Sequence, residues 1–220
     1  MKTRLTEQFG IRHPVLCAPM ALIAGGRLVA AVSDAGGLGI LGGGYAGAFG
    51  GEPDLEEELR LVEGRKFGVG FISWALDRAP QAFEEALKYS PYCVFLSFGD
   101  PQPHANKVHD AKAKLVCQVQ TLQHVDQALD AGADAIVAQG TEAGGHGAAR
   151  STLPLIPEVA DYLAKRAPNR LPAFGYVFDG GQRGCWAVAR PPSRGEPPRK
   201  YGPASRVVIE KRGLAGFSCR

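Results

Sequence analysis

Residues 114–139, KLVCQVQTLQHVDQALDAGADAIVAQ, place an amphipathic helical pattern between two short apolar runs. The runs Lys114–Gln118 and Ala135–Gln139 are continuously apolar for most of their length, which is typical of parallel strands covered on both faces. Between them, apolar residues recur at helical spacing, with Thr121 placed to cap the helix and Gly132 to end it. This stretch therefore predicts one strand–helix–strand unit of a parallel sheet.

The same unit repeats towards the N-terminus. Further apolar runs typical of buried strands are Val15–Ala18, Leu38–Leu41, Phe67–Phe71 and Cys93–Ser97. Helical patterns lie between them, and the strand starts recur every 21 to 29 residues. Six consecutive copies predict an α/β fold, either a (β/α)8 TIM barrel or an open doubly wound sheet. A seventh strand is expected to begin near residues 171–172.

Composition separates the chain into two parts at residue 172. The 220 residues include 45% hydrophobic and 21% charged residues, which excludes global disorder, collagen and coiled coil. Residues 173–220 hold seven Arg, two Lys and three acidic residues, a net charge of +6, whereas residues 1–172 carry −3. We therefore predict a barrel body over 1–172 and a basic tail rich in Gly, Pro and Arg over 173–220, poorly ordered and without a nucleic-acid partner.

The cysteines and the N-terminus favour a cytoplasmic protein. The five cysteines form no CxxC motif, and three of them sit inside apolar runs, where a free thiol acts as a small hydrophobe. Residues 1–7 turn polar before an apolar signal region can form, and the most apolar stretch carries Ser33 and Asp34. We therefore expect neither a signal peptide nor a membrane span.

The glycines between residues 36 and 51 match GxGxxG twice. Neither match leads directly into a helix, which the dinucleotide fingerprint requires. We therefore favour a glycine-rich loop that lets the backbone approach a ligand closely.

Residues 139–147, QGTEAGGHG, are the most informative segment for chemistry. Polar groups at the carboxyl ends of barrel strands face the active site, and Gln139 ends a strand there. Gly144 and Gly145 remove side chains where a planar or phosphate-bearing ligand could contact the backbone. His146 fits a general base, because imidazole exchanges protons near neutral pH. A loop histidine bonded only to backbone fits the pattern equally well.

The remaining candidate motifs are weak or missing. His104, His109 and His124 lie in hydrophilic contexts and are expected at the surface. The sequence has no HExxH, GxSxG or GxxxxGK[ST] motif and no cluster with metal-ligand spacing. These absences argue against metalloprotease, α/β-hydrolase and P-loop functions, and no metal site is predicted.

Four segments together resemble the nitronate monooxygenase family, formerly called 2-nitropropane dioxygenases. They are Pro14–Met20, Ala35–Gly39, Phe67–Phe71 and Gln139–His146, and the resemblance spans roughly residues 5–172. It implies a (β/α)8 barrel that binds FMN at the carboxyl ends of its strands. There it would oxidise alkyl nitronates with O2 to carbonyl compounds and nitrite.

The resemblance also implies site residues. His146 matches the catalytic histidine, which takes a proton from a nitroalkane or holds the nitro oxygens of the nitronate. Gly70 stands where many relatives carry Asn, so it can contact a flavin only through its backbone. The implied cofactor-binding residues are Pro19, Met20, Gly70, Gln118, Gln139, Gly144 and Gly145.

The chain departs from the family after residue 172, where the two turns that cradle the FMN phosphate in relatives are replaced. We therefore expect an incomplete barrel with its last strand or two missing or replaced, together with weak FMN affinity and impaired activity. Flavin-dependent enoyl-acyl-carrier-protein reductases share a similar Glu-Ala-Gly-Gly-His segment. Two alternatives thus remain, an FMN-dependent enoyl-thioester reductase and a catalytically silent barrel fragment.

Overall fold

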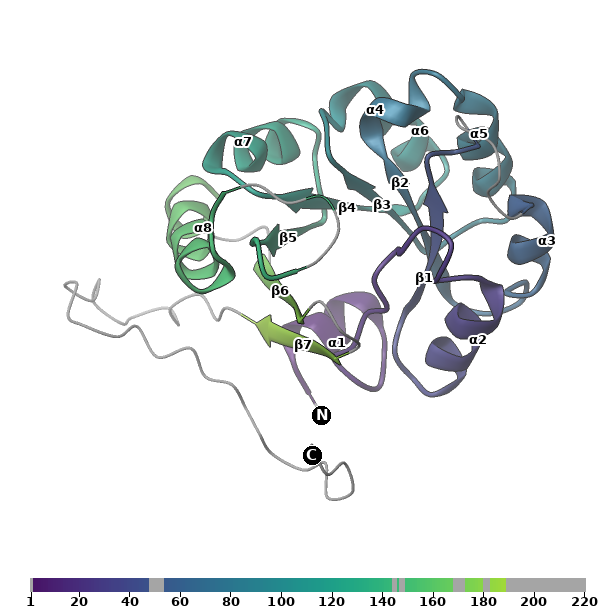
Figure 1. Cartoon of the computed structure of the whole chain (residues 1–220), viewed down its shortest axis with the longest axis horizontal. Helices are drawn as coiled ribbons and strands as arrows, with labels where there is room; N and C mark the ends of the chain where they lie inside the picture. Colours follow the sequence, from purple (N-terminus) through teal and green to yellow (C-terminus); the bar gives the residue numbers. More distant parts are fainter. Residues whose placement is uncertain are drawn as a thin grey trace.

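The computed structural model describes residues 2–47, 54–143, 146 and 149–167, and the backbone of two further strands. Helices and strands alternate along most of this length (Figure 1). The helices are α1 Arg4–Phe9, α2 Gly26–Asp34, α3 Leu55–Arg60, α4 Ser73–Leu76, α5 Pro80–Lys88, α6 Gln102–Asp110, α7 Leu122–Asp130 and α8 Thr152–Arg166. The strands are β1 Gly39–Gly44, β2 Phe67–Ile72, β3 Cys93–Ser97, β4 Lys114–Val119, β5 Ala135–Gln139, β6 Ala173–Asp179 and β7 Arg183–Val188.

The strands form one sheet in sequence order, β1 to β7. Strands β1 to β6 pair in parallel, and β7 pairs antiparallel with β6. A doubly wound sheet would reverse its strand order partway, whereas unbroken sequential order is the arrangement of a β/α barrel. The curved sheet with helices around its outside confirms the predicted TIM-barrel class (Figure 1). Within the described strands, β1 and β7 are outermost, and a single parallel bridge extends the sheet beyond β1.

The first predicted strand, Val15–Ala18, is reduced to a single parallel bridge between Leu16 and Leu38. The Cys17 amide donates to the Leu38 carbonyl at 2.8 Å, and the Leu38 amide donates to the Val15 carbonyl at 2.9 Å. Pro14 and Pro19 bound this segment, and neither has an amide hydrogen to lengthen the ladder.

The side chains of the sheet separate into two cores. Inward-facing residues fill the barrel interior, and outward-facing residues of the same strands pack against α2 to α8. The interior core comprises Leu5, Phe9, Leu16, Leu38, Ile40, Cys93, Phe95, Val116, Ala135 and Val137. This two-sided burial explains the continuous apolar runs in the sequence.

Helix α1 closes the amino-terminal end of the barrel. Thr3 caps it through a reciprocal capping box with Thr6. The Gln8 side chain donates to the Asp134 carbonyl at 2.6 Å, and the Tyr92 hydroxyl donates to the Gln8 carbonyl at 3.1 Å. The sequence analysis missed this helix because six residues are too short to show a clear period.

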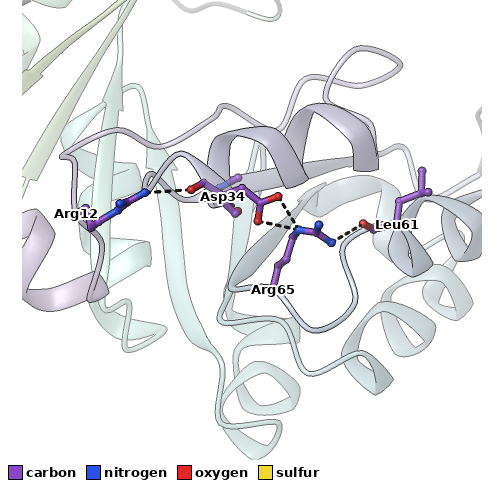
Figure 2. Close-up of polar contacts among 6 residues, drawn as sticks. Arg12, Asp34, Leu61 and Arg65 are labelled. Carbon is purple, nitrogen blue, oxygen red and sulfur yellow. Dashed lines mark hydrogen bonds and ion pairs between the residues drawn. The ribbon is translucent and has the colours of Figure 1, made fainter.

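A polar cluster ties together the chain segments around the same end (Figure 2). The Arg12 guanidinium donates to the Asp34 carbonyl at 3.1 Å, while Arg65 Nε donates to both Asp34 carboxylate oxygens at 2.9 and 3.1 Å. Arg65 also reaches the Leu61 carbonyl at 3.4 Å. Because these groups are largely exposed, the ion pair contributes at most about 1 kcal/mol. It joins the end of α2 to the segment that leads into β2.

The glycine-rich stretch differs from the sequence interpretation. Strand β1 spans residues 39–44, which confirms the predicted strand at Leu38–Leu41 and shows that the prediction of a ligand-facing loop is wrong for Gly42–Gly44. A Cβ on Gly39 would collide with the α2 backbone at Val29, and a Cβ on Gly42 would collide with the Met20 carbonyl. These glycines make room for close packing of the chain on itself.

Two buried cysteines agree with the sequence predictions, whereas one histidine does not. Cys93 and Cys117 are buried free cysteines, as expected for small hydrophobes, and burial raises the pKa of Cys93 to about 12. The surface prediction is wrong for His104, which is buried against Phe83 on the outer face of the sheet. Desolvation lowers its pKa.

The sheet continues past the predicted boundary at residue 172, since β6 begins at Ala173 and β7 follows. The predicted seventh strand corresponds to β6, because the first predicted strand is only a bridge. Residues 180–182 and 189–220 lie outside the described residues. The poorly ordered tail therefore stays a prediction.

Candidate active site

Three glutamine side chains meet at the carboxyl end of the barrel. Gln118 and Gln139 occupy inward positions one step beyond the interior residues Val116 and Val137. Gln120 follows β4 at the next inward position. The Gln139 Oε1 atom accepts from Gln118 Nε2 and from Gln120 Nε2, both at 2.7 Å. The amides therefore form a connected polar layer directly above an apolar interior.

His146 lies over this layer and contacts residues from other strand ends. Gln120 Nε2 donates to the His146 carbonyl at 3.0 Å. The Tyr45 hydroxyl lies 3.4 Å from His146 Nε2, and the Phe98 ring centroid lies 5.3 Å from the imidazole centroid. Tyr45 follows β1, and Phe98 follows β3. Groups that follow three different strands therefore contact His146, and two of them, Tyr45 and Phe98, contact its exposed imidazole.

Phe98 holds a strained backbone conformation at this place. Its φ is 54°, in the left-handed region that a bulky side chain rarely adopts. Such strain persists only where the surrounding structure enforces it, and it gathers at functional sites. Phe98 presents its ring to His146 from this position.

Pro19 and Met20 pack over the ends of β1 and β2. A Cβ on Gly70 would collide with the Pro19 ring. The Met20 carbonyl accepts from the Ala24 amide at 2.8 Å and lies against Gly42. Gly70 therefore makes room for Pro19, and an Asn at this position would displace the Pro19–Met20 segment.

Glu142 anchors the loop after β5 to helix α8. Its Oε2 atom accepts from the Thr152 amide at 2.7 Å and from the Thr152 hydroxyl at 2.8 Å. The bond from the Thr152 backbone is the largest cause that lowers the pKa of Glu142, from 4.5 to about 2. The negative charge at a helix N-terminus is also favourable. Glu142 is therefore a structural residue at the base of the loop that leads to His146.

We expect the unfolding free energy of Glu142→Gln to fall less steeply than that of wild type as the pH decreases below 4.5. Because folding lowers this pKa, the stabilisation is fully present above pH 4.5 and is lost as pH falls towards about 2. Urea unfolding of wild type and variant across that range measures the difference. Glu63→Gln, at an exposed position after α3, is the matched control. Equal pH slopes for Glu142→Gln and wild type would refute the anchoring role.

The structure thus brings together most of the residues predicted from the sequence. Gln118, Gln139 and His146 belong to one hydrogen-bonded network, and Pro19 lies on Gly70. Gly144 and Gly145 lie outside the described residues. The sequence analysis missed Gln120, Tyr45 and Phe98. Alternation along β4 was a signal for Gln120, because positions 118 and 120 share one face.

The side-chain amides of the glutamine layer suit the polar edge of a flavin ring. Among the described residues, no group donates a hydrogen bond to Gln118 Oε1 or Gln120 Oε1. The pyrimidine edge of a flavin carries both carbonyl oxygens and an N–H, which carboxamides complement. Pro19 and Met20 offer apolar, partly exposed surface for the rest of a planar ring. The described residues hold no cluster of metal-ligating side chains, and none of their helices is long and apolar enough to span a membrane.

Comparison with known proteins agrees with this geometry. Residues 2–68 and 77–175 match the family model for nitronate monooxygenase. A nitronate monooxygenase of Neurospora crassa is 34% identical over 217 residues, covering 81% of this chain and 57% of that protein. The (3aS,4S,5R,7aS)-5-hydroxy-7a-methyl-1-oxo-octahydro-1H-indene-4-carboxyl-CoA dehydrogenase of Mycobacterium tuberculosis is 32% identical over 186 residues, covering 82% of this chain and 50% of that protein. The chain spans about half the length of these curated relatives.

Solved structures of related proteins also match this chain. FabK from Thermotoga maritima has a TM-score of 0.65 and 29% identity, with 79% of this chain and 53% of that chain covered. A nitroalkane oxidase from Streptomyces ansochromogenes has a TM-score of 0.59 and 25% identity, with 78% and 59% covered. Both TM-scores are above 0.5, so these structures share the fold of the matched part of this chain. Since the family model matches most of the residues, the chain belongs to the nitronate monooxygenase family.

Proposed function

We propose that this chain is an FMN-dependent oxidoreductase that uses O2 to convert alkyl nitronates to carbonyl compounds and nitrite. The observation that carries the proposal is the network at the carboxyl end of the barrel. There Gln120 joins the side-chain amide of Gln139, a proposed cofactor contact, to His146. A proton-transferring residue is thereby held beside a surface that complements a flavin.

FMN would supply the electron acceptor for the reaction. Gln118 and Gln139 would bind its pyrimidine edge, and Pro19 and Met20 would cover part of its ring. By resemblance, Gly70, Gly144 and Gly145 contribute backbone contacts. These glutamine side chains lie directly above the packed interior core, which supports them from below. We call the proposed FMN site, formed by Gln118, Gln139, Pro19 and Met20, the cofactor seat.

His146 would take the proton from the carbon that bears the nitro group and would then hold the nitro oxygens of the resulting nitronate. The Tyr45 hydroxyl contacts Nε2, and Phe98 packs against the ring, so the direction of the imidazole is restricted. A base that is already oriented avoids the entropic cost of finding the reactive geometry.

Flavin loading and nitrite release test the proposal. The purified chain, supplied with FMN, should show the visible absorbance of bound flavin and release nitrite from an alkyl nitronate in air. A colourless protein that fails to bind added FMN would contradict the proposal and favour the silent barrel fragment. Free FMN with no protein is the control for uncatalysed nitrite release.

An enoyl-thioester reductase is the second candidate. Two similarities favour it: the structural similarity to FabK, and the sequence similarity to the Mycobacterium tuberculosis dehydrogenase, whose name gives a CoA ester as its substrate. This reaction requires NADH or NADPH as the electron donor. NADH oxidation that depends on an enoyl thioester, without nitrite release from nitronates, would select this candidate.

We also propose that the protein acts in the cytoplasm on small molecules, without nucleic-acid or membrane partners. The buried free thiols of Cys93 and Cys117 support a reducing compartment. Fractionation of the native host cells, with detection by antibody, tests the location.

A further inference from the structure

We propose that Gln120 is a positioning residue that sets the place of His146 relative to the cofactor seat. The inference rests on the proposed function. Gln120 is 9% exposed and lies between β4 and the capped start of α7. Its Nε2 atom donates to Gln139 Oε1 at 2.7 Å and to the His146 carbonyl at 3.0 Å. One carboxamide therefore spans the two parts of the proposed site.

The backbone at Gln120, from which the side chain extends, is held by hydrogen bonds at the start of α7. The backbone amide of Gln120 donates to His124 Nδ1 at 3.3 Å, and the backbone amide of His124 donates to the Thr121 hydroxyl at 3.2 Å. Helix α7 then buries Val125 and Ala128 against the sheet. A side chain that leaves a rigid strand end and a capped helix start has little freedom, so its two hydrogen bonds have fixed directions.

Gln120 and Tyr45 constrain different parts of His146. Gln120 holds the carbonyl, whereas the Tyr45 hydroxyl and the Phe98 ring contact the imidazole. The backbone bond determines where the residue stands, and the ring contacts determine where the imidazole points. Loss of the Gln120 bond should therefore release the position of His146 even when Tyr45 and Phe98 remain.

The chemistry requires a donor at position 120. Both acceptors, Gln139 Oε1 and the His146 carbonyl, present oxygen to the side chain. Gln120→Leu removes both donors, whereas Gln120→Glu keeps the shape and replaces them with acceptor oxygens when ionised. Gln123→Leu and Gln123→Glu, at an exposed position on α7, are matched controls.

Imidazole NMR spectra of the uniformly 15N-labelled chain test the inference without any turnover. The His146 signals are identified by their loss in His146→Ala. In Gln120→Leu and Gln120→Glu we expect them to shift towards those of the exposed His13 or to broaden. The signals of buried His104 should stay in place and report that the fold is intact. His146 signals that superimpose on wild type in both variants would overturn the inference.

Turnover of the flavin-loaded chain gives the second readout. Gln120→Leu should lower kcat for a neutral nitroalkane by about 10- to 100-fold, because small misplacement of a catalytic group is costly. KM and the flavin content should stay close to wild type, and the Gln123 variants should match wild type. Wild type that neither loads flavin nor turns over would refute the proposed function, while the NMR comparison still decides the role of Gln120. Active wild type with unchanged kcat in Gln120→Leu would refute the positioning role alone.

Discussion

Replacing His146 by alanine lowers the rate of nitrite release from a neutral nitroalkane by about 10²- to 10⁴-fold, the usual contribution of a positioned general base. Flavin stays bound, because the amide layer of Gln118 and Gln139 is intact in this variant. A preformed nitronate has already lost its proton, so its oxidation should fall much less. Steady-state nitrite assays with both forms of one substrate measure the two rates.

The two substrates separate the possible roles of His146. Equal losses for nitroalkane and nitronate would mean that the imidazole holds the nitro oxygens and does not take the proton. His13→Ala is the control, because His13 is exposed and precedes the first bridge at the opposite end of the barrel. Wild-type rates with both substrates in His146→Ala would remove His146 from the mechanism.

Phe9→Ala should cost about 3–5 kcal/mol of unfolding free energy, the typical loss for truncating a buried aromatic ring. Phe9 is 0% exposed, and its ring centroid lies 6.1 Å from that of Tyr92. It is the large side chain by which α1 fills the amino-terminal end of the interior core. Truncation leaves a cavity that the rigid strand ends cannot fill. Urea unfolding of the purified variant measures the loss.

Two variants calibrate the Phe9 result. Phe9→Leu keeps much of the buried volume and should cost clearly less than Phe9→Ala. Leu153→Ala removes a side chain that is 62% exposed and should change the unfolding free energy by about 0.5 kcal/mol or less. A midpoint for Phe9→Ala that matches Leu153→Ala would show that α1 does not close the barrel.

The strand–helix repeat was predictable because burial of a strand on both faces produces a continuous apolar run in the local sequence. Residues 114–139 form β4, α7 and β5 as the apolar pattern indicates, with Thr121 capping α7. The first predicted strand was wrong in extent, because ladder length depends on donors that Pro14 and Pro19 lack. Helix α1 escaped detection because its six residues are too short to show a clear period, and the residues that bury its apolar side chains lie far away in the chain.

The site was predictable only in part. Resemblance pointed to Gln118, Gln139 and His146, and the structure joins them in one network. Alternation along β4 places Gln120 on the same face as Gln118, but its bridging role, like that of Tyr45, depends on which strand ends meet.

The sequence by itself determined the βα units and the polar residues at their strand ends, because polarity and helix caps act over a few neighbouring residues. Only the tertiary structure decided that the strands run in sequential order and that Gly70 seats Pro19. It also decided that Gln120 bridges Gln139 and His146. These contacts join positions 19 to 51 residues apart, and such distant groups meet only when the curvature of the sheet brings its strand ends together.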